Sequence, residues 1–295
     1  MKKTIFTGMA TAIVTPMTEN GIDYDALGRL IDFQIENGIH AIGVMGTTGE
    51  NATIEPEDQK EVIRFTVEKV AKRVPVIAGT GTNNTAHVLE NTKNACEVGA
   101  DAVLVVTPYY NKATQKGLIQ HFTLVADAST VPVILYNVPG RTGCNLLPET
   151  VAMLANHPNI VGIKEATGNM AQMVKLRHLC GDKIDIYSGE DALTVPMMAM
   201  GGKGTISVLS NVVPKEASAM AEACLKGDYE TASQMQCDLL PLIDLLFCEV
   251  NPIPAKAAVS ALGFGENYLR LPLTPMEEQN QEKLLKEMRK LGLQV

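Results

Sequence analysis

Short apolar runs recur along residues 10–208, and stretches with helical periodicity separate them. Most of these runs are apolar at consecutive positions, which is typical of strands buried on both faces, as in a parallel sheet. Several of the intervening stretches end at a glycine, such as Gly38 and Gly99, which is a common helix stop. The eight runs are Ala10–Thr15, Ala41–Gly46, Pro75–Gly79, Ala102–Thr107, Pro132–Asn137, Ile160–Glu165, Asp185–Ser188 and Gly204–Val208.

Eight strands that alternate with helices form either a closed barrel or an open doubly wound sheet. An open sheet of this kind is expected to carry a glycine-rich turn after its first strand. Here Thr15-Pro16-Met17 follows the first run instead. The pattern therefore predicts an α/β fold, a (β/α)8 TIM barrel, over residues 1–225.

Helical patterns dominate the rest of the chain, residues 226–295. The clearest are Asp228–Cys248, Ala255–Leu262 and Glu277–Leu291, and no Gly/Ser-rich linker precedes them. We therefore expect a C-terminal helical extension that packs on the barrel rather than an independent unit.

The composition limits the classes of partner. The chain has 295 residues, 46% of them hydrophobic, and a formal net charge of -8. Such a balance predicts a folded protein and disfavours nucleic acid or an anionic membrane as the main partner. No apolar run approaches the ~18 residues of a membrane span. The apolar N-terminal stretch is interrupted by Thr7 and Gly8, which favours a first strand over a signal peptide.

Cysteine and histidine positions predict neither disulfides nor a metal site. The six cysteines contain no CxxC pair, so we interpret them as reduced thiols of a cytoplasmic protein. The five histidines show no ligand spacing. Gly201-Gly202-Lys203-Gly204 resembles a phosphate cradle, but it precedes the eighth strand and would lie at the end of the barrel that is usually not catalytic.

Lys164 is the lysine that lies within an apolar run, and it is the sharpest candidate for chemistry. Burial of an ammonium group is unfavourable unless the group is paired or loses its proton, and a neutral amine forms imines with carbonyl compounds. A structural ion pair with the neighbouring Glu165 would explain the position equally well.

Other polar residues follow strands at the same end of the predicted barrel. Tyr136 could relay protons, or be a barrel aromatic with a bonded hydroxyl. Thr47 and Thr48 suit a small carboxylate, or an ordinary turn with a helix cap. Arg141 could bind a carboxylate through two hydrogen bonds, or be a solvated surface residue.

Four motifs in order resemble one enzyme family. GTTGE at 46–50, TPYYN at 107–111, YNVPGRTG at 136–143 and GIKEATGN at 162–169 are similar to the 4-hydroxy-tetrahydrodipicolinate (dihydrodipicolinate) synthase family. That family belongs to the N-acetylneuraminate lyase superfamily of class I aldolases. The resemblance extends over essentially the whole chain, including Asn251–Pro254.

The resemblance implies catalytic roles. Lys164 matches the lysine that forms a Schiff base with pyruvate, and Tyr136 matches the proton donor and acceptor. Thr47 and Tyr110 match the other members of a hydroxyl relay, with Tyr110 supplied across a subunit interface. The implied enzyme needs no cofactor or metal, and a homotetramer is the usual state of the family.

The resemblance also implies substrate contacts. Thr48, Ile206 and Gly189 match positions around pyruvate. Arg141 matches the residue that receives the carboxylate of L-aspartate 4-semialdehyde. The implied product, 4-hydroxy-tetrahydrodipicolinate, begins the committed route to diaminopimelate and lysine.

The sequence departs from lysine-inhibited members of the family at the effector cleft. Asn83 and Tyr109 keep the pattern, whereas Pro56, Gln59 and His87 replace histidines and an acid. We therefore expect L-lysine to inhibit weakly or not at all.

Two other functions remain open at this point. Another pyruvate-dependent aldolase of the superfamily, such as N-acetylneuraminate lyase or a keto-deoxy sugar acid aldolase, would share the lysine and the tyrosine. Arg141 in its PGRTG context and the run Tyr109–Asn111 favour the synthase. A non-catalytic barrel that binds a keto acid would lack a covalent adduct on Lys164.

Overall fold

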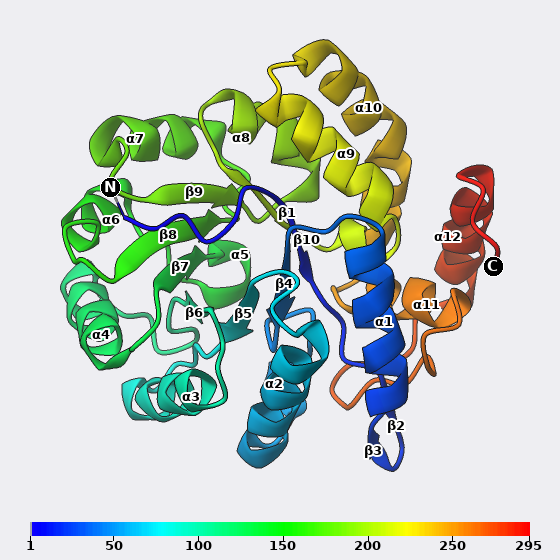
Figure 1. The fold of residues 1–295 in the computed structure, drawn as a ribbon, viewed down its shortest axis with the longest axis horizontal. Coiled ribbons are helices and arrows are strands. Elements are labelled where there is room, and N and C mark those ends of the chain that lie inside the picture. The colour runs from blue at the N-terminus through cyan, green and yellow to red at the C-terminus, as the bar shows by residue number, and fades with distance from the viewer. Residues whose placement is uncertain (1) are drawn as a thin grey trace.

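The computed structural model describes residues 2–295 and contains a closed barrel of eight parallel strands within them. Each apolar run of the sequence overlaps one of these strands, although the first strand begins two residues before its run, so the predicted fold class is confirmed. Around the barrel the order is β1-β10-β9-β8-β7-β6-β5-β4, and helices surround it (Figure 1). The strands are β1 Gly8–Ala12, β4 Ala41–Val44, β5 Val76–Gly79, β6 Ala102–Val106, β7 Val133–Asn137, β8 Ile160–Glu165, β9 Asp185–Ser188 and β10 Gly204–Ser207.

Helices follow the strands and begin where the sequence places capping groups. The side chains of Asp23, Asn84, Thr114 and Asn169 accept hydrogen bonds from backbone N–H groups in the first turns of α1, α3, α4 and α7. The helices are α1 Tyr24–Glu36, α2 Pro56–Val70, α3 Thr85–Glu97, α4 Gln115–Ala128, α5 Pro139–Thr142, α6 Pro148–Leu154, α7 Met170–Cys180, α8 Thr194–Ala199 and α9 Pro214–Leu225.

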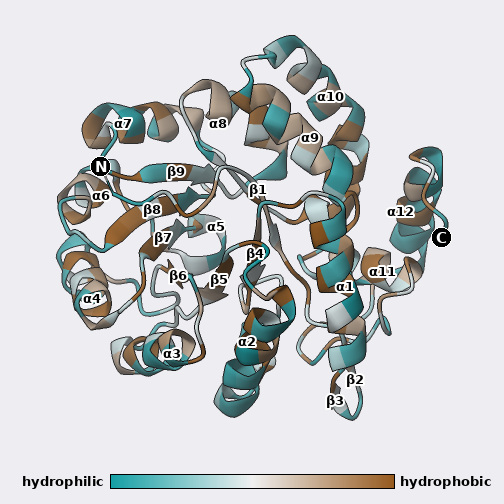
Figure 2. Ribbon diagram, in the orientation of Figure 1, coloured by the Kyte–Doolittle hydropathy of each residue, from teal (hydrophilic) through white to brown (hydrophobic). Residues whose placement is uncertain are grey.

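Alternation along each strand divides the core into two parts. In β7, Val133 and Leu135 pack outward against the helices, whereas Ile134 and Tyr136 face the barrel interior. Figure 2 shows the result, with apolar strands at the centre and helices whose colour changes around their circumference. This alternation decides which side chains can meet inside the barrel.

Three further helices form the C-terminal part of the chain, namely α10 Tyr229–Leu246, α11 Ile253–Ala261 and α12 Glu278–Lys290. In Figure 1 they lie along one side of the barrel, and α10 packs against both α9 and α12. The division at residue 225 stays a prediction, because α9 contacts β1 of the barrel as well as α10.

Several short elements were not predicted. Met17–Thr18 (β2) and Gly21–Ile22 (β3) form a two-stranded antiparallel hairpin, and strands of two residues are too short to show a pattern. The 3₁₀ helix η1, Asn51–Thr53, follows β4, and η2 Asp191–Leu193 and η3 Leu209–Asn211 follow β9 and β10. No helix in residues 2–295 is both long and apolar enough to cross a membrane.

Candidate active site

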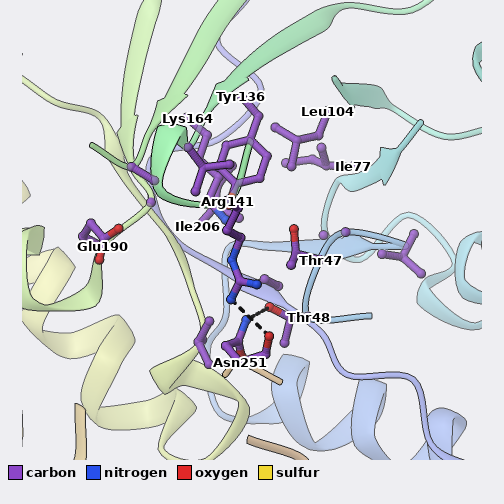
Figure 3. A pocket seen from close by; sticks show the side chains of 18 of the residues that line it. Thr47, Thr48, Ile77, Leu104, Tyr136, Arg141, Lys164, Glu190, Ile206 and Asn251 are labelled. Atoms are coloured by element: carbon purple, nitrogen blue, oxygen red, sulfur yellow. Dashed lines mark hydrogen bonds between the residues drawn. The ribbon is translucent and has the colours of Figure 1, made fainter. Parts of the chain in front are cut away.

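A cavity opens at the carboxyl ends of the strands, where barrel enzymes bind their substrates. Loops after β4, β7 and β9 contribute to its wall, together with β8 and β10 (Figure 3). Seven of the eight residues that the sequence singled out line it together: Lys164, Tyr136, Thr47, Thr48, Arg141, Ile206 and Gly189.

Lys164 reaches the cavity because of its place on β8. The parallel register pairs it with Tyr136 on β7, and both side chains point into the barrel interior. The ammonium nitrogen Nζ lies 4.6 Å from the centre of the Tyr136 ring. Only 6% of Lys164 is exposed, so its amine is held against an aromatic face and largely out of water.

The surroundings of Lys164 favour a neutral amine. Burial lowers the pKa of Lys164 to about 8, and the guanidinium of Arg141 acts in the same direction. The carboxylates of Asp191 and Glu190 oppose this shift without cancelling it. With a pKa of 8, about a tenth of the amine is unprotonated at pH 7, far more than for a free lysine.

Glu165 does not pair with Lys164, so the structural ion pair considered from the sequence is wrong. Successive residues of a strand point to opposite faces, and the Glu165 carboxylate lies outside the barrel interior. It accepts hydrogen bonds from Asn137 Nδ2 at 3.1 Å, the backbone N–H of Thr167 at 3.0 Å and Gln172 Nε2 at 3.4 Å. Within residues 2–295, Lys164 takes part in no ion pair.

Tyr136 keeps its phenol proton at neutral pH. Burial raises the pKa of Tyr136 to about 12, while Arg141 and the neighbouring Thr47 side chain oppose the shift. The phenol is therefore a proton donor that stands beside the Lys164 amine.

Asn251 joins two of the predicted binding residues, and sequence reasoning did not include it in the site. Its Nδ2 donates to Thr48 Oγ1 at 3.0 Å, and its backbone carbonyl accepts from Arg141 Nη2 at 3.1 Å (Figure 3). Asn251 precedes α11, so the C-terminal helices supply one wall of the cavity. The only signal for it was its place in the Asn251–Pro254 motif.

Gly189 and Ile206 shape the cavity around Lys164. A Cβ at position 189 would lie 2.5 Å from the Ala166 Cβ and 3.0 Å from the Lys164 Cε. A side chain there would displace the lysine stem, so glycine is required. Ile206 on β10 is buried and forms part of the apolar wall.

Tyr110 is the predicted site residue that the single chain does not bring to the cavity. It is 89% exposed and has a left-handed backbone with φ of 72°. Its neighbour Tyr109 lines a second cavity, which shares Thr47, Tyr136 and Arg141 with the first. The side chain of Tyr110 is therefore free for a contact outside its own chain.

Other features of the described chain have no place in this site. Residues 2–295 contain no group of three or more histidine, cysteine, aspartate or glutamate side chains arranged to hold a metal ion. Gly201–Lys203 precede β10 and Gly204 begins it, and a Cβ on Gly204 would overlap the Gly8 carbonyl oxygen. That glycine therefore permits close strand packing at the opposite end of the barrel.

Comparisons with known proteins agree on one family. The model of the dihydrodipicolinate synthetase family matches residues 5–291. A 4-hydroxy-tetrahydrodipicolinate synthase from Alkaliphilus oremlandii is 55% identical over 289 residues, which cover 98% of this chain and 100% of that protein.

Solved structures give the same result. Dihydrodipicolinate synthase from Aquifex aeolicus is 45% identical with a TM-score of 0.97, covering 98% of this chain and 99% of that one. The chloride-inhibited dihydrodipicolinate synthase from Acinetobacter baumannii, solved in complex with pyruvate, is 43% identical with a TM-score of 0.96 and covers 98% and 100%.

Proposed function

Because this chain belongs to the dihydrodipicolinate synthetase family and is a lyase like its curated relatives, we propose that it condenses pyruvate with L-aspartate 4-semialdehyde through a Schiff base on Lys164. The observation that carries the proposal is a buried lysine that has no ion-pair partner among residues 2–295 and is held beside a protonated phenol at the carboxyl end of the barrel. The related protein solved with pyruvate supports the choice of keto acid.

The first step uses the neutral Lys164 amine as a nucleophile. Its nitrogen lone pair attacks the keto carbon of pyruvate, and proton transfers convert the keto oxygen into water, which leaves as the imine forms. Tyr136 is placed to donate and accept these protons. The hydroxyl and backbone groups of Thr47 and Thr48 suit the pyruvate carboxylate, and Ile206 and Gly189 leave room for the methyl group.

Carbon–carbon bond formation follows. Loss of a methyl proton gives an enamine, whose carbon attacks the aldehyde carbon of the second substrate as the aldehyde oxygen takes up a proton. Arg141, on the open side of the cavity, suits the carboxylate of that substrate. The amino group of the second substrate then attacks the imine carbon, which closes the ring and releases the Lys164 amine.

Tyr110 belongs to this proposal as the third hydroxyl of the relay, supplied by a second copy of the chain. Its exposure and its position beside Tyr109 at the adjoining cavity support a contact of this kind. The homotetramer and the cytoplasmic location stay predictions.

The direct test compares two reactions of the purified protein. The proposal expects condensation of pyruvate with L-aspartate 4-semialdehyde and little cleavage of N-acetylneuraminate or keto-deoxy sugar acids. The Lys164→Arg variant is the control, because its guanidinium keeps the positive charge but stays protonated and forms no imine with pyruvate. Faster cleavage of a sugar acid than condensation would assign the chain to another branch of the superfamily.

We also propose that L-lysine inhibits this enzyme weakly or not at all. Gln59 stands at a position that the resemblance assigns to the effector cleft, and its Nε2 donates to the carbonyls of Asn51 and Ile54 at 2.9 and 2.7 Å. The Gln59 side-chain NH₂ group therefore already donates to backbone carbonyls of its own chain. His87 is exposed and offers no fixed negative charge to an effector's amino group.

A titration of the condensation rate with L-lysine tests this point. We expect full activity at submillimolar lysine. A His87→Glu variant is the informative comparison, because it adds an acid to the cleft. Inhibition of the unmodified enzyme at submillimolar lysine would contradict the proposal.

A further inference from the structure

A second buried lysine lies outside the cavity and is not used by the chemistry above. Lys256 on α11 is 2% exposed, and its Nζ forms an ion pair with Glu50, whose side chain is fully buried. The same Nζ donates to the backbone carbonyl of Thr15 at 2.7 Å. Glu50 Oε2 has no hydrogen-bond partner in residues 2–295, so Lys256 is the counter-charge on which this carboxylate depends.

The pair is attached to the loop that carries Thr47 and Thr48. Glu50 comes two residues after Thr48, has a left-handed backbone with φ of 58°, and its N–H donates to the Thr47 carbonyl at 3.1 Å. Thr15, the other partner of Lys256, donates from its hydroxyl to the Gly49 carbonyl at 2.8 Å. Lys256 therefore holds the far end of this loop at two points.

The C-terminal segment contacts the same loop at two more places. Asn251 Nδ2 binds Thr48 Oγ1, and Arg270 Nη1 donates to the Thr53 carbonyl at 2.8 Å. These contacts come from residues about 200 positions away in the sequence. The orientation of the two threonines therefore depends on elements that do not belong to the barrel.

We propose that Glu50 and Lys256 are a positioning pair, which fixes the loop of residues 46–53 so that Thr47 and Thr48 face the cavity. Neither charged group lines the cavity. The left-handed conformation at Glu50 is unfavourable for a residue with a side chain, and the buried ion pair offsets that cost. The inference rests on the proposed function for the identity of the ligand, pyruvate. The role of the ion pair in fixing the loop does not depend on the proposed function.

The test measures condensation kinetics for Glu50→Gln, Lys256→Met and the double variant. We expect the KM for pyruvate to rise about tenfold or more in each single variant, since small displacements of binding groups have large effects. The value of kcat per folded enzyme changes much less. The double variant buries no unpaired charge, so its KM rises by less than the product of the two single effects.

A matched control separates positioning from loss of stability. Leu176→Ala removes a fully buried side chain from α7, the helix that follows β8, whereas this loop follows β4. We expect it to lower the unfolding temperature without changing the pyruvate KM. A pyruvate KM that is unchanged in both single variants, or that rises equally in Leu176→Ala, would overturn the inference. If a single variant does not fold, the pyruvate KM of the double variant is compared with that of the unmodified enzyme, and an unchanged KM would overturn the inference.

Hydrogen exchange of the ligand-free proteins distinguishes failure of this inference from failure of the proposed function. Amides of residues 46–53 should exchange faster in Lys256→Met, and in the double variant, than in Leu176→Ala. Equal rates in all of them would refute the positioning role even if the wild-type enzyme is active. An unmodified protein that forms no pyruvate adduct would instead refute the proposed function and the pyruvate part of this inference.

Discussion

Lys164 and Lys256 are buried to a similar degree, yet their surroundings give them different properties. Lys164 lies in a cavity beside an aromatic ring and forms no ion pair within the part of the chain that the structure describes. The side chain of Lys256 extends from α11 to the loop after β4, where it contacts Glu50 and the Thr15 carbonyl. Burial lowers the pKa of both amines.

The difference lies in what opposes that shift. For Lys256 the opposing group is a carboxylate in direct contact, which favours the charged amine. For Lys164 the nearest acids are not in contact, and the Asp191 carboxylate already accepts two backbone N–H groups, of Val208 and Leu209, at 2.9 Å. A buried lysine thus becomes a nucleophile where its ammonium group lacks direct contact with a carboxylate. It becomes a structural cation where a carboxylate contacts it.

Lys164→Met should produce the largest change. We expect the condensation rate to fall by more than about 10³-fold, because Lys164 is the one lysine among the described residues that line the cavity. Lys256→Met should keep measurable turnover at saturating pyruvate. Steady-state kinetics of the two variants side by side test the contrast, and comparable residual activities would contradict it.

In urea unfolding, Lys256→Met should show a larger loss of stability than Lys164→Met, the opposite of their order in loss of activity. Lys256→Met leaves Glu50 as an unpaired buried charge, and we expect a loss of about 3–5 kcal/mol in the free energy of unfolding. Lys164→Met breaks no ion pair of the described residues and replaces an amine with an apolar group, so stability should be unchanged or higher. The Glu50→Gln/Lys256→Met double variant should lose less than Lys256→Met alone. Equal losses in both single variants would mean that the ion pair is not the cause.

Tyr136→Phe tests whether the phenol, rather than burial alone, makes Lys164 effective. Removal of the proton donor should slow condensation by about 10²-fold. The adduct between pyruvate and Lys164 should still form, since the amine and its burial are retained. Mass measurement after reduction would show this, and complete absence of the adduct would indicate that the Tyr136 hydroxyl is already required for imine formation.

The pH dependence gives the smallest of these effects. Only the neutral amine attacks, so the rate of adduct formation should rise about tenfold per unit as pH approaches 8 from below, then level off above it. An unperturbed lysine would continue to gain rate to about pH 10.4. Stopped-flow measurement with pyruvate alone isolates this step, and a plateau that begins near pH 10 would contradict the proposed environment.

The sequence predicted those parts of the molecule that have a regular pattern. Strands such as Ile160–Glu165 are buried on both faces, so consecutive apolar residues identified them. The rule that barrel enzymes place polar groups at the carboxyl ends of strands then predicts that Lys164, Tyr136 and Arg141 lie together.

Contacts between distant segments could not be predicted in this way. Alternation along β8 separates Glu165 from Lys164, but the groups that satisfy the Glu165 carboxylate, Asn137 and Gln172, belong to other elements. The contacts from Asn251 to Thr48, and from Lys256 to Glu50, join residues with no local relationship in the sequence. Such pairs are determined by packing of the C-terminal helices, and single-sequence patterns carry no information about it.

Borohydride reduction in the presence of pyruvate, followed by peptide mapping, tests the central claim most directly. The account predicts one stable adduct, with the mass of reduced pyruvate, on the peptide that contains Lys164 and none on the peptide that contains Lys256. Omission of pyruvate should leave both peptides unmodified. An adduct on Lys256, or no adduct on Lys164, would contradict the assignment of Lys164 as the Schiff-base lysine.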